Sequence, residues 1–132
     1  NFEKFNDNKK LKIHCNNFDE DFEIIFKDEL NYAIGNIIQN AILYSRSKVD
    51  IILTATNYEI IFKIEDDGYG FSREVLDKLG EPYISKNNKG MGLGIFISKN
   101  LIENMKGTII FYNSLKNNAV VEIKLEKAIL IK

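Results

Sequence analysis

Two asparagines, Asn36 and Asn40, stand four residues apart in a segment whose apolar residues recur every three or four positions. On a helix, residues at this spacing share one face, and neither asparagine belongs to the apolar stripe. An amide oxygen is a hard, neutral ligand that suits Mg²⁺ when phosphates supply other ligands. Two solvated asparagines on an outer helix face would give the same pattern, so the pair alone does not decide between the two interpretations.

A second polar group lies in the run Asp66-Asp67-Gly68-Tyr69-Gly70, which follows a predicted strand. The run could be only a tight turn, because glycine adopts positive φ at no steric cost. Asp66, however, is expected at the sheet edge with its side chain facing inward. A carboxylate only accepts hydrogen bonds, so it can bind the exocyclic amine of adenine, whereas guanine presents a carbonyl at that place.

The third segment, Gly90-Met91-Gly92-Leu93-Gly94, opens a predicted helix. Glycines let a ligand approach the backbone closely, and a helix N-terminus offers free N–H groups and a positive dipole end to phosphate. The segment is not a P-loop, because no Gly-Lys-Ser/Thr follows it. It is not the dinucleotide fingerprint either, because no strand leads directly into it.

The elements that must position these segments follow from hydrophobic periodicity. Alternation of apolar and polar residues predicts strands, and recurrence at three and four residues predicts helices. Asp28 and Ser72 are the predicted N-caps of two helices, and Gly107 is the predicted stop of another. The expected order is strands at Lys10–Cys15 and, more weakly, Phe22–Phe26; a helix to about Tyr44; strands at Val49–Ala55 and Glu59–Glu65; a short helix ending near Leu79; a loop at Glu81–Gly90; a helix at Leu93–Met105; and strands at Thr108–Tyr112 and Ala119–Leu125.

This order predicts an α+β fold, a two-layer sandwich in which a mixed β-sheet carries helices on one face. The 132 residues suit one domain, residues 1–132. A start at Asn1 without methionine suggests a segment cut from a longer protein.

Composition narrows the possible partners. The formal net charge of -1 gives no bulk attraction to nucleic acid or membrane, and no apolar run is long enough to span a bilayer. The single cysteine, Cys15, is expected to be a small buried apolar residue, and it fits a reducing, cytoplasmic setting. Whether the full-length protein is anchored in a membrane stays open.

In this order and spacing, the three segments resemble the histidine-kinase ATPase family, whose members share the Bergerat ATP-binding fold. The family's asparagine motif resembles the segment from Asn36 to Ala41, and its two glycine motifs resemble Asp66–Gly70 and Gly90–Gly94. The segment from Leu79 to Tyr83 is similar to the Phe-Glu-Pro-Phe sequence that starts the family's ATP lid. The resemblance extends from Leu11 to Leu125.

The resemblance implies a role for each matching residue. Asn40 would bind Mg²⁺, Asn36 would be the catalytic residue that supports the phosphate–metal cluster, and Asp66 would accept from the adenine amine. Tyr44 would pack beside the adenine, and the lid around Tyr83 to Lys89 would be mobile without nucleotide. The full set expected at ATP is Asn36, Asn40, Tyr44, Asp66, Gly68, Gly70, Tyr83, Lys86, Lys89, Gly90, Met91, Gly92, Leu93 and Gly94.

The chain departs from the family pattern at three places. Leu43 stands where many relatives have a lysine or arginine that contacts phosphate, and Arg46, Lys86 and Lys89 are the candidates to replace it. Asn118-Ala119 replaces a late Gly-Thr pair, and the lid is short.

Asn36 discriminates between branches of the superfamily. Gyrase-type, chaperone-type and mismatch-repair ATPases, and the anti-sigma-factor kinases, resemble one another in having a glutamate at this position, and an asparagine cannot take a proton. Asn36 therefore favours a sensor kinase, which would donate phosphate to a histidine on a separate dimerisation domain of the same kinase and act on a response regulator downstream. The alternatives are an anti-sigma-factor serine/threonine kinase and a degenerate nucleotide-sensing module, which Leu43 motivates.

The only histidine of the chain is not expected to be the phosphate acceptor. His14 lies on a predicted strand and is followed by Cys15. The family resemblance implies an acceptor on a dimerising helix, followed directly by an acidic residue. His14 is therefore expected on the polar face of the sheet.

Overall fold

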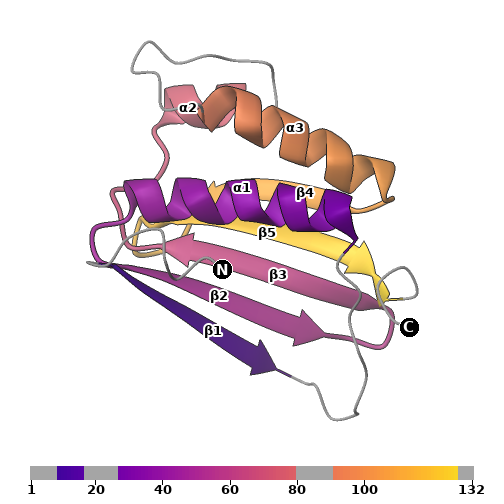
Figure 1. Ribbon diagram of the computed structural model, residues 1–132. Coiled ribbons are helices and arrows are strands. Elements are labelled where there is room, and N and C mark those ends of the chain that lie inside the picture. Colours follow the sequence, from indigo (N-terminus) through magenta and orange to yellow (C-terminus); the bar gives the residue numbers. More distant parts are fainter. Residues whose placement is uncertain (1–8, 17–26, 80–90, 128–132) are drawn as a thin grey trace.

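The computed structural model of Figure 1 describes residues 9–16, 27–79 and 91–127. Every helix and strand predicted within these ranges is present, with bounds that differ by one or two residues. The weak strand predicted at Phe22–Phe26 lies outside the described residues. The elements are β1 (Lys10–Asn16), α1 (Asp28–Tyr44), β2 (Lys48–Ala55), β3 (Glu59–Asp66), α2 (Arg73–Lys78), α3 (Met91–Asn104), β4 (Thr108–Asn113) and β5 (Ala119–Glu126).

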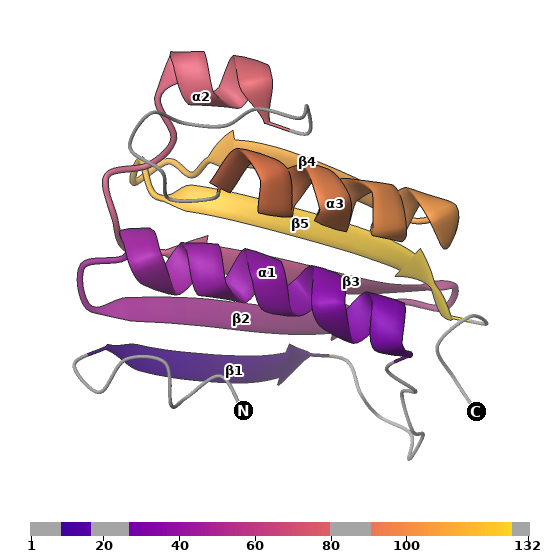
Figure 2. The ribbon, with the colours of Figure 1, turned by 45° about the horizontal axis from the view of Figure 1, so that its top comes forward.

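The five strands form one mixed sheet in the order β1-β2-β3-β5-β4. β1 pairs with β2 in parallel, and the other three pairs are antiparallel. α1 packs on β2 and β3, and α3 packs on α1 and β4. Figures 1 and 2 show these two helices on the same face of the sheet. The predicted two-layer α+β sandwich is therefore confirmed.

The alternation in β3 decides which way its last residue points. Ile60, Phe62 and Ile64 are buried in the core between sheet and helices, and Asp66 follows in the same alternation and is buried too. Burying one large apolar side chain contributes about 1.5–3 kcal/mol. A one-residue slip would turn Asp66 outward only by exposing all three apolar residues. The apolar residues of β3 therefore hold the Asp66 carboxylate on the helix side. The facing stripe of α1 is Leu30, Ala33, Ile34, Ile37, Ile38, Ala41 and Ile42.

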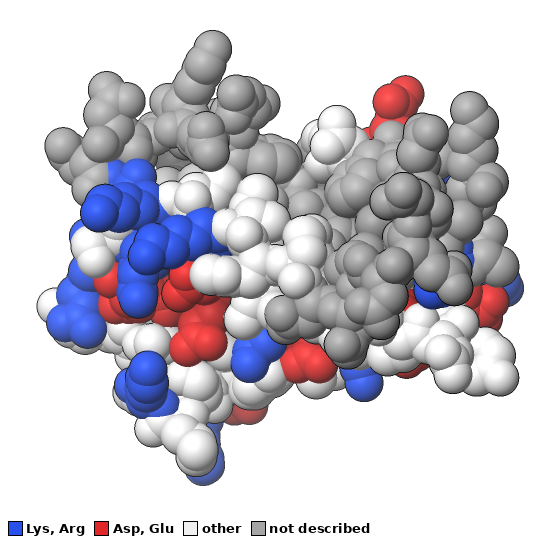
Figure 3. Space-filling model, turned by 90° about the horizontal axis from the view of Figure 1, so that it is seen from below, with Lys and Arg blue, Asp and Glu red and all other residues white. Residues whose placement is uncertain are grey.

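The opposite face of the sheet is polar and charged. His14 and Lys48 both form ion pairs with Asp50 there, at 3.5 and 3.9 Å. Figure 3, seen from below, shows basic and acidic side chains next to one another on the part of this side that is not drawn in grey. His14 is exposed and pairs in register with Ile52 of β2. Val49 of β2, which pairs with Asp66, faces the core. Ile52 is three residues from Val49, so His14 lies on the face of the sheet opposite Asp66. The prediction that His14 is a surface residue of the polar face is confirmed.

The apolar side of β1 corrects one prediction. Leu11 is half-buried, but Ile13 is 57% exposed and Cys15 is exposed as well. The expectation of a buried Cys15 was therefore wrong. β1 is an edge strand, and α1 packs on β2 and β3, so no described helix covers its outer residues.

The helix ends follow the predicted signals with one exception. The N-cap position of α1 is Lys27, which makes no side-chain cap, and Asp28 lies inside the first turn. The prediction of Asp28 as the N-cap was wrong, although a carboxylate in the first turn still interacts favourably with the helix dipole. Ser72 caps α2 as predicted, because its side chain accepts from the N–H of Val75.

α3 ends in a hydrogen-bonded stop of the Schellman type. The N–H of Gly107 donates to the Ile102 carbonyl at 3.0 Å, and the N–H of Lys106 donates to Glu103 at 3.0 Å. Lys106, not Gly107, has the left-handed backbone, with φ 65°. Gly107 is required for packing, because a Cβ there would lie 2.5 Å from Leu125 Cδ2. Within residues 27–79 and 91–127, no helix combines the length and apolarity needed to cross a membrane.

These two positions give a test of the fold. We expect Gly107→Ala to lower the free energy of unfolding by about 1–3 kcal/mol, because the added methyl overpacks against β5. Lys106→Gly is the matched control and should leave stability unchanged or raise it, because glycine adopts the left-handed conformation without a Cβ penalty. Urea unfolding of both variants measures the difference, and equal stabilities would contradict the packing explanation.

Candidate functional site

Asp66 ends β3 in an apolar surrounding. It is 6% exposed and pairs with the buried Val49 of β2. On the side of β5, the preceding residue Glu65 pairs with the buried Val120. Burial raises the pKa of Asp66 to about 6, although the Gly68 N–H, which donates to Oδ1 at 2.8 Å, acts in the opposite direction. The carboxylate is thus a hydrogen-bond acceptor held in a mostly dry place.

The loop after β3, which we call the glycine loop, contains Gly68 and Gly70 and packs against the end of α1. A Cβ on Gly68 would collide with the Tyr44 carbonyl oxygen and lie 3.0 Å from Asp66 Oδ1. Only glycine allows this contact, which brings the last residue of α1 and the buried carboxylate together. Tyr44 itself is 38% exposed.

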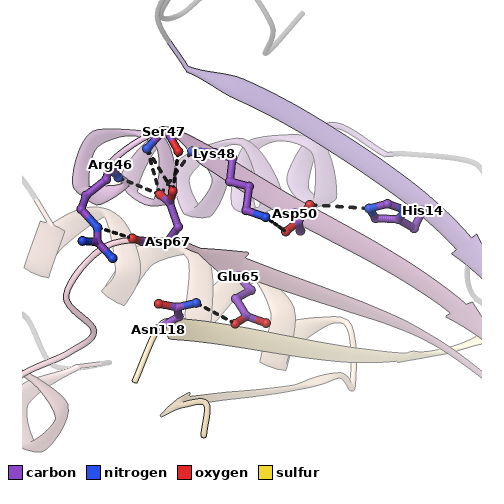
Figure 4. Close-up of polar contacts among 8 residues, drawn as sticks. All are labelled: His14, Arg46, Ser47, Lys48, Asp50, Glu65, Asp67 and Asn118. Carbon is purple, nitrogen blue, oxygen red and sulfur yellow. Dashed lines mark hydrogen bonds and ion pairs between the residues drawn. The ribbon is translucent and has the colours of Figure 1, made fainter. Parts of the chain in front are cut away.

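The neighbouring carboxylate, Asp67, has the opposite environment. It accepts from the N–H groups of Arg46 at 2.7 Å, Ser47 at 3.0 Å and Lys48 at 3.2 Å, and from Ser47 Oγ at 2.6 Å (Figure 4). Partial burial alone would raise the pKa of Asp67, but the hydrogen bonds from Ser47, Lys48 and Arg46 outweigh it and hold the pKa well below its usual range. Asp67 therefore ties the connection between α1 and β2 to the end of β3.

Asn36 and Asn40 are half-buried on α1, and Asn36 faces α3. A Cβ on Gly94 would lie 4.0 Å from Asn36 Cγ. The Nδ2 atom of Asn36 is buried and has no hydrogen-bond partner among the described residues. A buried, unsatisfied amide costs about 1–3 kcal/mol. The geometry therefore leaves a hydrogen-bond donor beside the first turn of α3, where a ligand would satisfy it.

The first turn of α3 contains the predicted phosphate segment. The helix begins at Met91, two residues before the predicted start, so Gly92, Leu93 and Gly94 belong to its first turn. The first N–H groups of a helix have no partner within it. α3 is fixed against α1 by the buried Ser98, whose Oγ donates to the Ala33 carbonyl at 3.0 Å. The remaining predicted residues, Tyr83, Lys86, Lys89 and Gly90, lie outside the described residues.

The C-terminal end of α1 has a cap that sequence patterns did not reveal. The last turn of the helix carries no basic residue. Lys9, the residue before β1, supplies the charge, because its Nζ donates to the carbonyls of Ile42 at 2.6 Å and Leu43 at 3.4 Å. A cation at a helix C-terminus is favourable. This ammonium also acts against the raised pKa of Asp66, as the smallest of the contributions.

Of the three residues expected to replace a basic group at Leu43, Arg46 is described, and Lys86 and Lys89 lie outside the described residues. Leu43 is 47% exposed at the end of α1. Arg46 lies beyond that end, with its guanidinium 5.1 Å from the centre of the Tyr69 ring and its Nε donating to the Asp67 carbonyl at 2.9 Å. Asn36 lies more than two helical turns earlier. Arg46 is therefore engaged at the Asp66 end of the site.

Together these contacts define one line along α1. Asn36, Asn40 and Tyr44 are at i, i+4 and i+8, so they follow one face over about 12 Å. Gly94 lies at one end of this line, and Gly68 with Asp66 lies at the other. The arrangement suits an elongated ligand that is anionic near α3 and carries an amine donor near β3.

Comparison with known proteins identifies the family of the chain and proteins of similar fold. Residues 26–129 match the family of histidine kinase-, DNA gyrase B-, and HSP90-like ATPases. Sporulation kinase A of Bacillus subtilis is 34% identical over 85 residues, which cover 63% of this chain and 14% of that kinase. Sensor histidine kinase RegB of Cereibacter sphaeroides is 31% identical over 102 residues, covering 69% of this chain and 22% of that protein. The chain thus spans less than a quarter of the length of these relatives.

Solved structures are similar over most of the chain. The mycobacterial sensor histidine kinase MprB has a TM-score of 0.77 at 17% identity, covering 95% of this chain and 88% of that chain. The catalytic domain of histidine kinase ThkA has a TM-score of 0.75 at 24% identity, covering 91% and 81%. At these identities the likeness concerns the fold.

The two adjacent carboxylates should respond oppositely to neutralisation. The folded-state pKa of Asp66 is raised, so its ionisation penalty is absent below about pH 4 and complete above about pH 6. We expect Asp66→Asn to raise the free energy of unfolding by about 2 kcal/mol at pH 7.5 and to leave it unchanged near pH 4. Urea unfolding at both pH values measures the change.

Asp67→Asn is the matched control. Because its folded-state pKa is lowered, Asp67 stabilises the fold above about pH 4, and its neutralisation should lower stability at pH 7.5. A stability change of the same sign in both variants would contradict the assigned environments.

Proposed function

The chain belongs to the histidine kinase-, DNA gyrase B-, and HSP90-like ATPase family, and we propose that it binds Mg-ATP between α1, α3 and the end of β3. We further propose that it donates the γ-phosphoryl group to a histidine on a separate dimerisation domain, with a response regulator as the downstream partner. The observation that carries this proposal is the line of Asn36, Asn40 and Tyr44, with an unsatisfied amide at one end and a buried carboxylate at the other.

Asp66 would select the base. Its carboxylate accepts one hydrogen bond from Gly68 and keeps further acceptor capacity. The exocyclic amine of adenine is a matching donor, whereas guanine would place a carbonyl against the carboxylate. Tyr44 and the glycine loop would enclose the base, since Gly68 lies directly against the end of α1.

The opposite end suits phosphate and metal. The unpartnered Nδ2 of Asn36 is a donor for a phosphate oxygen, and the first turn of α3 adds backbone N–H groups and a positive dipole end. Asn40 would offer its amide oxygen to Mg²⁺, a neutral ligand that suits an ion shared with phosphates. The bound ion would supply charge neutralisation at the transferring group.

Two features favour transfer to a protein histidine over hydrolysis by water. Asn36 stands where a glutamate would act as a general base, and an amide cannot take the proton from water. The relatives that match include sporulation kinases and sensor histidine kinases. Positioning dominates phosphoryl transfer, so the acceptor must reach the end of the nucleotide in line.

A second candidate function is a nucleotide-sensing module without transfer activity. The exposed Leu43, where related kinases resemble one another in having a basic residue, is the observation that favours it. Mg-ATP binding is common to both proposals. Transfer of phosphate to a histidine-bearing helical domain distinguishes them, because the sensing module would bind nucleotide and label nothing.

The base contact at Asp66 and the metal contact at Asn40 can be tested separately. We expect Asp66→Ala to weaken the binding of both adenosine and ATP by about 10- to 100-fold, because a hydrogen bond to a charged group is lost. Asn40→Ala should leave adenosine affinity nearly unchanged but remove most of the affinity gained by adding Mg²⁺. Isothermal titration with and without Mg²⁺ measures both effects.

Circular dichroism of each variant serves as the folding control. Unchanged ATP affinity in a folded Asp66→Ala variant would contradict the assignment of the base contact. An equal benefit from Mg²⁺ in wild type and Asn40→Ala would place the metal ligand elsewhere.

The isolated chain should bind ATP without labelling itself. His14 lies on the face of the sheet opposite Asp66 and pairs with Asp50, so its ring cannot point toward a nucleotide between the helices and the sheet. Incubation with γ-labelled ATP should therefore yield no acid-labile phosphate on the chain. Stoichiometric label that disappears in His14→Ala would overturn this part of the proposal.

A further inference from the structure

The end of β4 and the turn that follows it hold the glycine loop through three asparagines, which we call the asparagine clasp (Asn113, Asn117 and Asn118). Asn113 makes two hydrogen bonds to one residue of the loop. Its Oδ1 accepts from the Phe71 N–H at 2.8 Å, and its Nδ2 donates to the Phe71 carbonyl at 2.9 Å. This pair of bonds reproduces the exchange between neighbouring residues of an antiparallel ladder, but it is made by a side chain.

The other two asparagines extend the contact along the loop. Gly70 has φ +82°, and a Cβ on it would lie 2.5 Å from the Asn117 carbonyl and 3.0 Å from Asn113 Oδ1. Asn118 Nδ2 donates to Glu65 Oε2 at 3.3 Å (Figure 4). The asparagine clasp therefore contacts the chain on both sides of Asp66 and Gly68.

The asparagine clasp is anchored to the core beneath it. Asn113 is the last residue of β4, and two residues earlier the Phe111 ring meets the Phe71 ring edge-on, with centroids 6.4 Å apart. Both rings pack against the buried core. Phe71 is thus held by its ring and by both of its backbone polar groups. The next residue, Ser72, caps α2.

We propose that Asn113 is a positioning residue for the base end of the nucleotide site. It fixes the path of Gly68 to Phe71, and hence the loop whose Gly68 N–H donates to the Asp66 carboxylate. This inference rests on the proposed binding of ATP. Without the two bonds, the loop would sample other paths, and a ligand would have to order it on binding, which lowers affinity.

Asn113→Asp is the sharpest variant. An aspartate keeps the shape and the acceptor for the Phe71 N–H, but it places an acceptor against the Phe71 carbonyl. We expect adenosine and Mg-ATP affinities to fall by the same factor, about 10-fold, while the relative gain from Mg²⁺ stays unchanged. The amide of Phe71 should also exchange faster with solvent than in the wild type.

Gly107→Ala is the matched control for lost stability. It perturbs packing against Leu125 near the C-terminal end of β5, whereas Asp66 lies beside the N-terminal end of that strand. It should lower stability without changing nucleotide affinity. If Asn113→Asp proves unfolded by circular dichroism, Asn113→Ser removes the same bonds without the repulsion and should weaken both ligands in equal proportion.

The outcomes separate the two proposals. A wild-type chain that binds neither ATP nor adenosine would contradict the proposed function and this inference together. A wild type that binds, alongside a folded Asn113 variant of equal affinity, would contradict this inference alone. A loss confined to the Mg²⁺-dependent part of binding would also overturn it, because the loop lies at the base end.

Discussion

A buried carboxylate at the end of β3 is the constraint around which the site is organised. The apolar alternation of that strand turns Asp66 toward the helices, beside the buried Val49, where water cannot fully solvate its charge. The raised pKa of Asp66 expresses this cost. Asp67 offsets this cost, because its carboxylate accepts hydrogen bonds from the backbone N–H groups of Arg46, Ser47 and Lys48, which stabilise it as an anion. Asp67 thus fixes the backbone through hydrogen bonds, whereas the Asp66 carboxylate keeps acceptor capacity for a ligand.

α1 connects the two ends of the candidate site. Its buried stripe packs on the sheet, and the line of Asn36, Asn40 and Tyr44 runs from the first turn of α3 to the glycine loop. Distant parts of the chain fix both ends of the helix. Ser98 binds its backbone from α3, and Lys9, the residue before β1, caps its last carbonyls. The asparagine clasp then fixes the glycine loop, so the site depends on packing well outside the ligand-facing residues.

Local patterns were sufficient to predict the helices, the strands and the two-layer sandwich, because periodicity reports which face of each element is buried. They failed where burial depends on neighbours in space. Cys15 and Ile13 alternate like core residues but lie on an edge strand. The roles of Asp67, Lys9 and Asn113 depend on contacts between residues 19 to 42 positions apart, which no spacing rule reveals. The asparagine and glycine motifs lie at the two ends of the candidate site, and both the ligand position and the roles of individual residues there stay predictions.

Base selectivity tests the central claim most directly. If Asp66 reads an exocyclic amine, isothermal titration of the wild-type chain at pH 7.5 with Mg²⁺ should give an affinity for ATP roughly 100-fold or more above that for GTP, because guanine leaves two acceptors facing each other. The phosphates are identical in the two ligands, so the ratio reports the base contact alone. Equal affinities for ATP and GTP would contradict the account.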